Sequence, residues 1–173
     1  MPDLRTTRLD DPQRLDELQR FRAAALSSGS HLPDVIEAAR YAFRGTIAAL
    51  SCVGPESTCF AGMASDVGDV ELEVPTRLAF CRRVVETGEP FIAKNLIVDP
   101  DYSDNPYVTQ PPYTRFYAGV PVRTPSGLVL GAFAVLSQEP SFRFNAEDLA
   151  ALQRFASIAL SMVTMRADLR AVA

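Results

Sequence analysis

The sequence has one histidine, three cysteines and no long apolar run, and each shortage excludes a class of function. With His31 as its only imidazole, the chain has little material for a zinc site or for a nucleophile activated by histidine. Because it lacks an apolar run of about 18 residues, we expect neither a membrane-spanning helix nor a membrane partner. The polar N-terminus has no apolar signal core, which predicts a cytoplasmic location and reduced cysteines.

Positive charge is also in short supply. Lysine and arginine number 17 against 21 aspartate and glutamate residues, which gives a net charge of -4 and a pI near 5.0. Nucleic-acid binding normally needs a basic face, so we expect no nucleic-acid partner. What the chain does have is apolar material. Hydrophobic residues make up 47% of its 173 positions, which is enough for the core of one domain.

The apolar pattern switches between helical and extended periods along the chain. It predicts the order helix, helix, strand, strand, helix, strand, long loop, strand, strand, helix, over residues 10–26, 32–45, 46–54, 57–64, 74–89, 90–95, 96–117, 118–124, 127–137 and 145–172. The tight connections "GPES" and "PSG" make antiparallel hairpins, and helices at both ends and in the middle must cover the sheet. The fold class is therefore α+β.

Side chains suited to capping stand at three of the predicted helix starts. Asp10 or Asp11 precedes the first helix, and Thr76 lies near the start of the middle helix. Asn145 opens the last helix, with Asp148 three residues later as in a capping box. These positions fix where we expect each helix to begin.

The segment 96–117 is long, irregular and rich in proline. Loops of this length are uncommon inside a compact domain and are often functional. Its stretch "DPDYSDN" alternates oxygen-bearing side chains like the start of a calcium loop. However, Asp104 stands where that loop needs glycine, and Gln110 stands where it needs a bidentate glutamate. We therefore interpret the stretch as turn-forming and expect no metal.

Asp99 and Arg115 bracket this loop, and two interpretations of them stay open. They pin the loop through a salt bridge or backbone hydrogen bonds, or both reach a pocket, where the guanidinium suits a carboxylate or phosphate ligand. Phe116 and Tyr117 follow directly and would add stacking walls. Strand alternation sends these two rings to opposite faces, so at most one of them lines a given pocket.

The cysteines allow a structural and a redox interpretation. The turn at residues 55–56 places Cys52 opposite Cys59, as two small buried hydrophobes or as a redox-sensitive pair. Cys81 is expected about five residues inside the middle helix and facing inward, as a core residue or as a thiol made reactive by the helix N-terminus. The redox role of all three stays open.

Three stretches carry a family resemblance: "AFCRRVVETGEPFIAKNLIVDPDYSDNP", "YTRFYAGVPVRTPSGLVLGAFAV" and the opening "DDPQRLDELQR". Over roughly residues 10–165 the chain resembles a GAF domain, of the bacterial type with an Arg-Phe-Tyr-Ala-Gly strand entry, here residues 115–119. That type begins its middle helix with Ser-Phe-Cys. This chain has Ala79, Phe80 and Cys81 there, so the serine is absent.

The resemblance implies a central antiparallel sheet of five or six strands, flanked by N-terminal, middle and C-terminal helices, with a small-molecule pocket on one face. It also implies an N-terminal dimerisation or linker helix over 1–30, a GAF domain over 31–165, and a long helix over 145–173 that continues out of the domain. Because GAF domains sense and regulate, we expect a non-enzymatic domain that binds a small molecule or a protein partner. Its output partner would be a kinase, a cyclase or another signalling domain.

Specialised types of GAF domain have characteristic sequence features that can be checked in this chain. The signature of cyclic-nucleotide-binding GAF domains is absent. A covalently attached bilin is disfavoured because Arg82, rather than a histidine, follows Cys81. Haem is disfavoured because His31 lies away from the pocket side. The alternative is an enzyme similar to free methionine-sulfoxide reductases, small GAF proteins that also use three cysteines. Cys52, Cys59 and Cys81 lie outside the motifs of those enzymes. We assign no cofactor and no catalytic residue.

The candidate pocket residues are aromatic, sulfur-bearing or polar side chains that the pattern and the resemblance place near the pocket. They are Phe60, Phe80, Cys81, Asp99, Asn105, Arg115, Phe116, Tyr117 and Phe133. A further interpretation is a degenerate GAF domain that serves only in dimerisation. Its pocket would then be filled by Phe60, Phe80 and Phe133.

The last helix carries an apolar stripe that is longer than one small sheet can cover. Such stripes usually mark a partner, so we expect a homodimer through the terminal helices. The alternative is fraying of the last two turns. The interface candidates share the 3–4 spacing of the first and last helices and are Leu15, Leu18, Leu152, Phe155, Ala159, Met162 and Leu169.

Overall fold

The computed structural model of the protein describes residues 7–27, 31–141 and 143–171, with side chains up to residue 165. Its centre is a six-stranded antiparallel sheet in the order β3-β2-β1-β6-β5-β4, which confirms the α+β fold class and the two predicted hairpins. The strands are β1 (Ile47–Val53), β2 (Ser57–Ser65), β3 (Glu73–Pro75), β4 (Phe91–Ala93), β5 (Phe116–Arg123) and β6 (Val129–Ser137).

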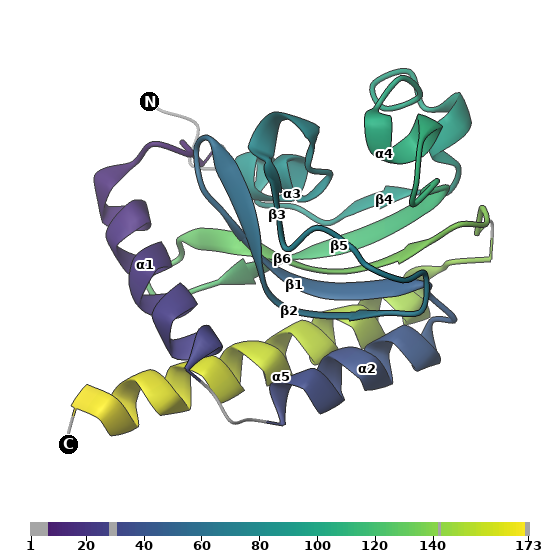
Figure 1. The fold of residues 1–173 in the computed structure, drawn as a ribbon. Coiled ribbons are helices and arrows are strands. Elements are labelled where there is room, and N and C mark those ends of the chain that lie inside the picture. Colours follow the sequence, from purple (N-terminus) through teal and green to yellow (C-terminus); the bar gives the residue numbers. More distant parts are fainter. Residues whose placement is uncertain (1–6, 28–30, 142, 172–173) are drawn as a thin grey trace.

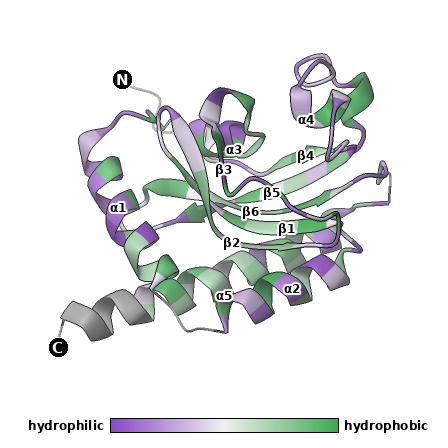
Figure 2. Cartoon of the chain, viewed as in Figure 1, coloured by the Kyte–Doolittle hydropathy of each residue, from purple (hydrophilic) through white to green (hydrophobic). Residues whose placement is uncertain are grey.

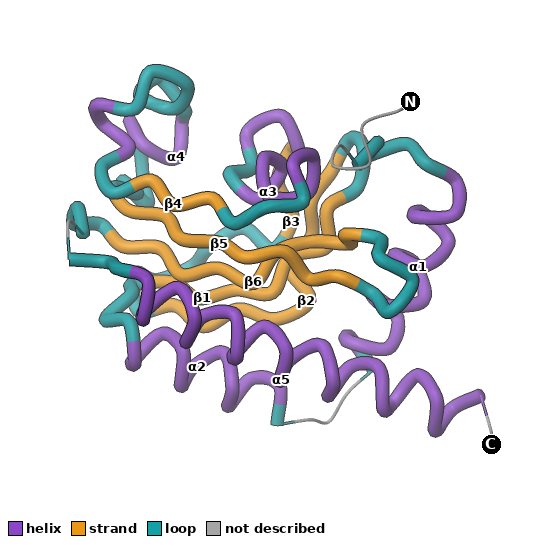
Figure 3. The backbone as a smooth tube through the Cα atoms, turned by 180° about the vertical axis from the view of Figure 1, so that it is seen from behind, coloured by secondary structure: helices purple, strands orange, loops and turns teal. Residues whose placement is uncertain are grey.

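Helices cover both faces of the sheet (Figure 1). Three of them lie on one face, α1 (Pro12–Leu26), α2 (Leu32–Ala42) and α5 (Ala146–Ala171). The short helices α3 (Cys81–Thr87) and α4 (Pro106–Thr109) lie over the other face. Seen from behind, α2 and α5 run along the sheet while α1 stands at one end of it (Figure 3). The sheet therefore has a layer of three longer helices on one face and only short helices and loops on the other.

The core follows this layering. One cluster of buried apolar side chains lies between the sheet and α1, α2 and α5, and a second lies between the sheet and α3. Every residue of β1 is buried, because helices or loops cover both faces of this central strand. The strand therefore lacks polar alternation and is an unbroken apolar run in the sequence. Figure 2 shows the hydrophobic residues concentrated in the central strands and on the inner sides of α2 and α5.

Two of the predicted helix caps are confirmed. Asp11 accepts a hydrogen bond from the backbone N–H of Arg14 at 2.9 Å and begins α1. At the start of α5, Asn145 accepts from the N–H of Glu147 at 2.7 Å, while the Asp148 carboxylate accepts from the N–H of Asn145 at 2.9 Å. This reciprocal pair is a capping box, and it satisfies N–H groups that the helix itself leaves unpaired.

The predicted start of the middle helix was wrong. A 3-10 turn over Thr76–Leu78 precedes α3, which begins only at Cys81. Thr76 does not cap α3, because its hydroxyl lies 2.8 Å from the carbonyl oxygen of Gly54 and 2.9 Å from the hydroxyl of Thr58. Cys81 is consequently the first residue of the helix rather than about the fifth.

Two segments contain regular structure that the sequence did not predict. The edge strand β3 pairs with β2, although its last two residues were predicted to begin the helix over 74–89. The long loop between β4 and β5 contains a 3-10 turn, Leu96–Val98, and the single-turn helix α4. Asn105 caps α4 by accepting from the N–H of Tyr107 at 2.9 Å, and its amide donates to the carbonyl of Leu78 at 2.9 Å. The loop is therefore fixed to the segment that leads into α3.

Arg14 ties α1 to the ends of the central strands. Its side chain is fully buried, and its guanidinium donates to the carbonyl oxygens of Val129 at 2.8 Å, Leu130 at 3.3 Å and Leu9 at 3.0 Å, and also to that of Val53. Burial lowers the pKa of this arginine from its usual value. The first helix is thus bonded directly to β1 and β6.

Candidate functional site

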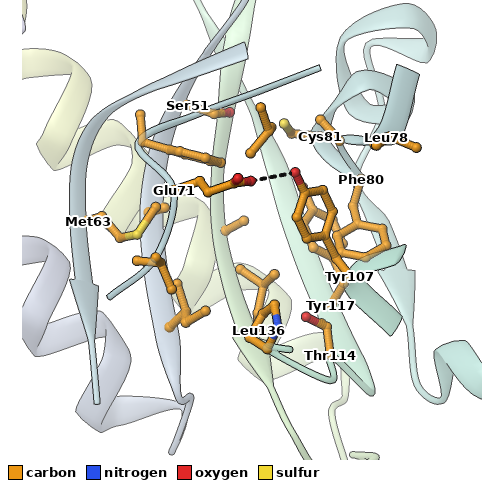
Figure 4. A pocket seen from close by; sticks show the side chains of 18 of the residues that line it. Ser51, Met63, Glu71, Leu78, Phe80, Cys81, Tyr107, Thr114, Tyr117 and Leu136 are labelled. Atoms are coloured by element: carbon orange, nitrogen blue, oxygen red, sulfur yellow. Dashed lines mark hydrogen bonds between the residues drawn. The ribbon is translucent and has the colours of Figure 1, made fainter. Parts of the chain in front are cut away.

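A cavity of about 500 Å³ lies on the face of the sheet opposite the long helices. Its floor is formed by β1 and β6, and its walls come from β2, from the segment before β3, from α3 and from α4 with the residues that follow it. Figure 4 shows side chains from these elements converging on the space. The volume lies in the range of small-molecule sites.

Small side chains make the middle of the floor. Ala49 and Ser51 of β1 and Ala134 of β6 line the cavity, together with the larger Ile47 and Leu136 of the same strands. Larger residues in place of the small ones would fill the space. Ser51 also joins the two strands, because its hydroxyl accepts from the N–H of Ala132 at 3.0 Å and donates to the carbonyl of Ala132 at 3.1 Å. This hydroxyl continues the ladder where the β1–β2 register shifts after Leu50.

Aromatic rings form one wall. Phe80 and Tyr117 both line the cavity, with ring centroids 5.5 Å apart, and Phe91 packs behind Tyr117 at 5.5 Å. Tyr117 is 2% exposed, and its hydroxyl has no hydrogen-bond partner among the described residues. Burial, the largest cause, raises the pKa of Tyr117 well above its usual value, so the phenol remains protonated. Here is a buried donor without an acceptor, a costly arrangement that proteins usually avoid.

Glu71 and Tyr107 meet beside the cavity. The Tyr107 hydroxyl donates to the Glu71 carboxylate at 2.9 Å, and both residues line the space (Figure 4). Burial, followed by the hydrogen bond to Glu71, raises the pKa of Tyr107 to about 12. The bond joins α4 to the segment before β3. Sequence reasoning missed both residues, because a glutamate in a polar loop and a tyrosine in a proline-rich one carry no distinguishing pattern.

The charged residues among the described cavity lining are both acidic, Asp69 and Glu71. Cys81 adds a thiol whose pKa burial raises to about 11, so it is protonated at neutral pH. The lining thus combines apolar and aromatic walls, two carboxylates and uncharged hydrogen-bonding groups.

Four of the predicted pocket residues lie together at this cavity: Phe60, Phe80, Cys81 and Tyr117. Phe116 and Phe133 do not, because alternation on their strands turns them into the core beneath the long helices. Phe116 packs on Phe144 with centroids 5.4 Å apart, and Phe133 stacks on Phe155 at 6.4 Å. Phe116 and Tyr117 therefore face opposite ways, as expected.

The other three pocket candidates have structural contacts instead. Arg115 donates to the carbonyl of Val108 at 2.6 Å, and Asp99 accepts from the N–H of Asp101 at 3.0 Å in a turn. Asn105 caps α4. None of these three is among the described residues that line the cavity, and each holds the 96–115 segment in place. Of the two interpretations of Asp99 and Arg115, backbone hydrogen bonds that pin the loop agree with these contacts.

Most of the dimer candidates pack within their own chain. Leu18, Leu152 and Ala159 are buried in the core cluster beneath the sheet, and Leu15 and Phe155 pack against that cluster. This corrects the expectation that they face a second copy, since the sheet and the neighbouring helices already cover them. Met162 remains partly exposed, and the side chain of Leu169 lies outside the described residues.

Cys52 and Cys59 are register partners in the β1–β2 hairpin, as the two-residue turn predicts. All three cysteines are free thiols. Cys52 belongs to the core beneath the long helices, whereas Cys81 belongs to the cluster on the cavity side. The sheet therefore separates the Cys52–Cys59 pair from the thiol at the cavity.

Two further properties follow from the described part of the chain. It contains no group of three or more histidine, cysteine, aspartate or glutamate side chains placed to hold a metal ion. Within the same residues, none of the helices combines the length and the apolar character needed to cross a bilayer.

Comparison with known proteins identifies the family. The GAF domain family matches residues 23–160. A cyclic di-GMP phosphodiesterase of Pseudomonas aeruginosa is 32% identical over 131 residues, which make up 75% of this chain and 22% of that protein. The chain therefore spans less than a quarter of the length of this curated relative.

Solved structures share the fold. The type II free methionine-R-sulfoxide reductase of Thermoplasma acidophilum is similar with a TM-score of 0.65 and 16% identity, over 84% of this chain and 96% of that one. The GAF-B domain of DevS from Mycobacterium smegmatis is similar with a TM-score of 0.62 and 16% identity, over 88% and 99% of the two chains. Identity at this level shows the fold alone. The family match, the six-stranded sheet and these shared folds lead to one conclusion: the chain belongs to the GAF domain family.

Proposed function

We propose that this GAF domain is a non-enzymatic sensory or regulatory unit, and that a small molecule bound in the cavity is its signal. The observation that carries the proposal is the cavity of about 500 Å³, lined by apolar and aromatic side chains and two carboxylates. The degenerate alternative needs a pocket filled by the chain's own rings, yet Phe133 packs on the opposite face of the sheet.

The strands give a route from the cavity to the terminal helices. β1 and β6 supply the floor on one face and pack against the long helices on the other. Arg14 of α1 bonds to carbonyl oxygens at the end of β1 and the start of β6, so a shift of these strands would move α1. In this proposal, α1 and α5 carry the output, through a homodimer, to a kinase, cyclase or other signalling partner. The relative from Pseudomonas aeruginosa, named as a cyclic di-GMP phosphodiesterase, supports a signalling context.

Native mass spectrometry of the purified protein tests this proposal. We expect a retained small molecule and a mass of two copies. Ala134→Phe would fill the floor and abolish retention, whereas Ala134→Ser, which keeps the volume, would not; melting temperatures would show that both variants fold. The absence of any retained ligand, together with identical behaviour of the two variants, would contradict the proposal.

A second candidate function is reduction of free methionine sulfoxide, which the Cys81 thiol at the cavity favours. Against it, burial raises the pKa of this thiol to about 11, and the other two cysteines lie beyond the sheet. An assay coupled to thioredoxin decides between the two. Turnover of free methionine sulfoxide that is lost in Cys81→Ser would establish the enzyme and overturn the non-enzymatic proposal.

A further inference from the structure

The charges around the cavity restrict what it can hold. Asp69 and Glu71 are the charged members of its described lining, and both are acidic. An anionic ligand would lose its water and meet carboxylates without gaining a cationic partner, which is unfavourable. Arg115, which the sequence suggested for binding a carboxylate or phosphate, instead donates to the backbone carbonyl of Val108 at 2.6 Å.

The side chains of the cavity wall favour a ligand with an aromatic ring system. Phe60, Phe80, Tyr107 and Tyr117 line the space, with aliphatic side chains between them. Rings such as these stack on a planar ligand and attract a cation toward their faces. Figure 4 shows Phe80, Tyr107 and Tyr117 grouped on one side and Glu71 reaching in from the other.

One polar group is placed to orient such a ligand. The Tyr117 hydroxyl is not that group, because it is enclosed beside Gly119 and has no surface open to the cavity. The Glu71 carboxylate is bound on one side by Tyr107 at 2.9 Å and is solvent-exposed, which leaves acceptor capacity for an ammonium group.

We propose that the cavity binds an uncharged or cationic aromatic molecule, and that it rejects phosphates and carboxylates. The inference rests on the proposed small-molecule function and specifies the class of ligand. The aromatic ring system of the ligand lies against the rings of the wall, and a basic group, where present, faces Glu71. Cyclic dinucleotides and amino acid carboxylates fall outside this class.

Three probes with one ring system and different charges test the proposal. They are 5-hydroxytryptamine, 5-hydroxyindole and 5-hydroxyindole-3-acetate, which are cationic, neutral and anionic at pH 7. Isothermal titration on the full chain at low ionic strength should give a dissociation constant at least tenfold lower for the cation than for the anion, with the neutral compound between them.

Variants assign the preference to particular residues. Glu71→Gln should reduce the ratio between the dissociation constants of the anionic and cationic probes about two- to fivefold, the size expected for an exposed ion pair. Glu73→Gln is the matched control, because this neighbouring glutamate bonds to Ser57 and is not among the described lining residues.

The outcomes separate this inference from the proposed function. Anion binding as tight as cation binding, or an anionic molecule retained in the purified protein, would overturn the inference and leave small-molecule sensing intact. Failure of all three probes would also overturn the ligand class, while any retained ligand in native mass spectrometry would still support the sensor. If the purified protein retained no ligand and none of the three probes bound, both proposals would be contradicted.

Discussion

Arg14 shows how one residue organises this domain. Its buried guanidinium donates to backbone carbonyl oxygens where β1 ends and β6 begins. No sequence pattern predicts this role, because an arginine in a first helical turn usually faces solvent. Burial here depends on where strand ends fall in three dimensions, and no local pattern encodes that.

Replacing Arg14 should destabilise the fold strongly. Arg14→Met keeps the length of the side chain but leaves several buried carbonyl oxygens unpaired, so we expect a loss of about 3 kcal/mol in the free energy of unfolding. Urea denaturation measures it. Arg20→Met is the control, since Arg20 is exposed beside Asp16, and it should change stability by less than about 0.5 kcal/mol. Equal effects of the two substitutions would contradict the assigned role of Arg14.

The thiols should differ sharply in reactivity. Hydrogen bonding to Cys52, the largest cause, lowers the pKa of the half-buried Cys59, whereas burial raises the pKa of Cys81 to about 11. We therefore expect Cys59 to react first with a thiol reagent in the folded protein, at a rate that rises with pH as the thiolate forms.

Removing the partner thiol tests that explanation. Without the Cys52 hydrogen bond, the pKa of Cys59 should return toward its ordinary value of about 8.5, which slows the reaction at pH 7 on the order of tenfold. Cys52→Ala should therefore protect Cys59, while Cys81→Ser should leave its rate unchanged. Rapid labelling of Cys81 in the folded protein would refute this assignment.

Among the elements, the hairpins could be predicted from the sequence, whereas the walls of the cavity could not. The two-residue turn fixed the register that pairs Cys52 with Cys59, because a tight turn leaves one antiparallel alignment. Strand alternation correctly separated Phe116 from Tyr117. The wall residues Glu71 and Tyr107 come from segments without a repeating pattern, so only tertiary packing brings them together. α3 begins late because Thr76 bonds to Gly54 and Thr58 instead of to the helix.

Gly131 should be irreplaceable in the central strand pair. A Cβ atom at this position would overlap the carbonyl oxygen of Ser51, a backbone atom of β1 that cannot turn aside. Gly131→Ala should therefore cost about 3 kcal/mol or more in thermal or urea unfolding, because β1 and β6 must separate.

Gly119→Ala provides the comparison on the neighbouring strand. Its Cβ would meet the ring and hydroxyl of Tyr117, a side chain that can move where a backbone cannot. We expect a smaller loss of stability than for Gly131→Ala, but weaker binding in the cavity, since Tyr117 lines it. A Gly131→Ala protein as stable as the wild type would show that the strands approach less closely than described.

At the scale of the whole molecule, the long helices leave one apolar strip uncovered. Ile158 and Met165 of α5 are 46% and 66% exposed and lie seven residues apart, on the same side of the helix. We expect this strip to form the homodimer contact, with Met162 between them. The double variant Ile158→Lys, Met165→Lys should convert dimers to monomers in sedimentation velocity. Ser157→Lys, on a different side of α5, should not; a wild-type monomer would contradict the expectation.

A crystal structure of the protein with 5-hydroxytryptamine locates the ligand and shows which residues hold it. We expect the indole ring in the cavity between the sheet and α3, against the rings of Phe80 and Tyr107, with its ammonium group beside Glu71. A cavity closed by the chain's own side chains, or a ligand bound elsewhere with this space unoccupied, would contradict this expectation.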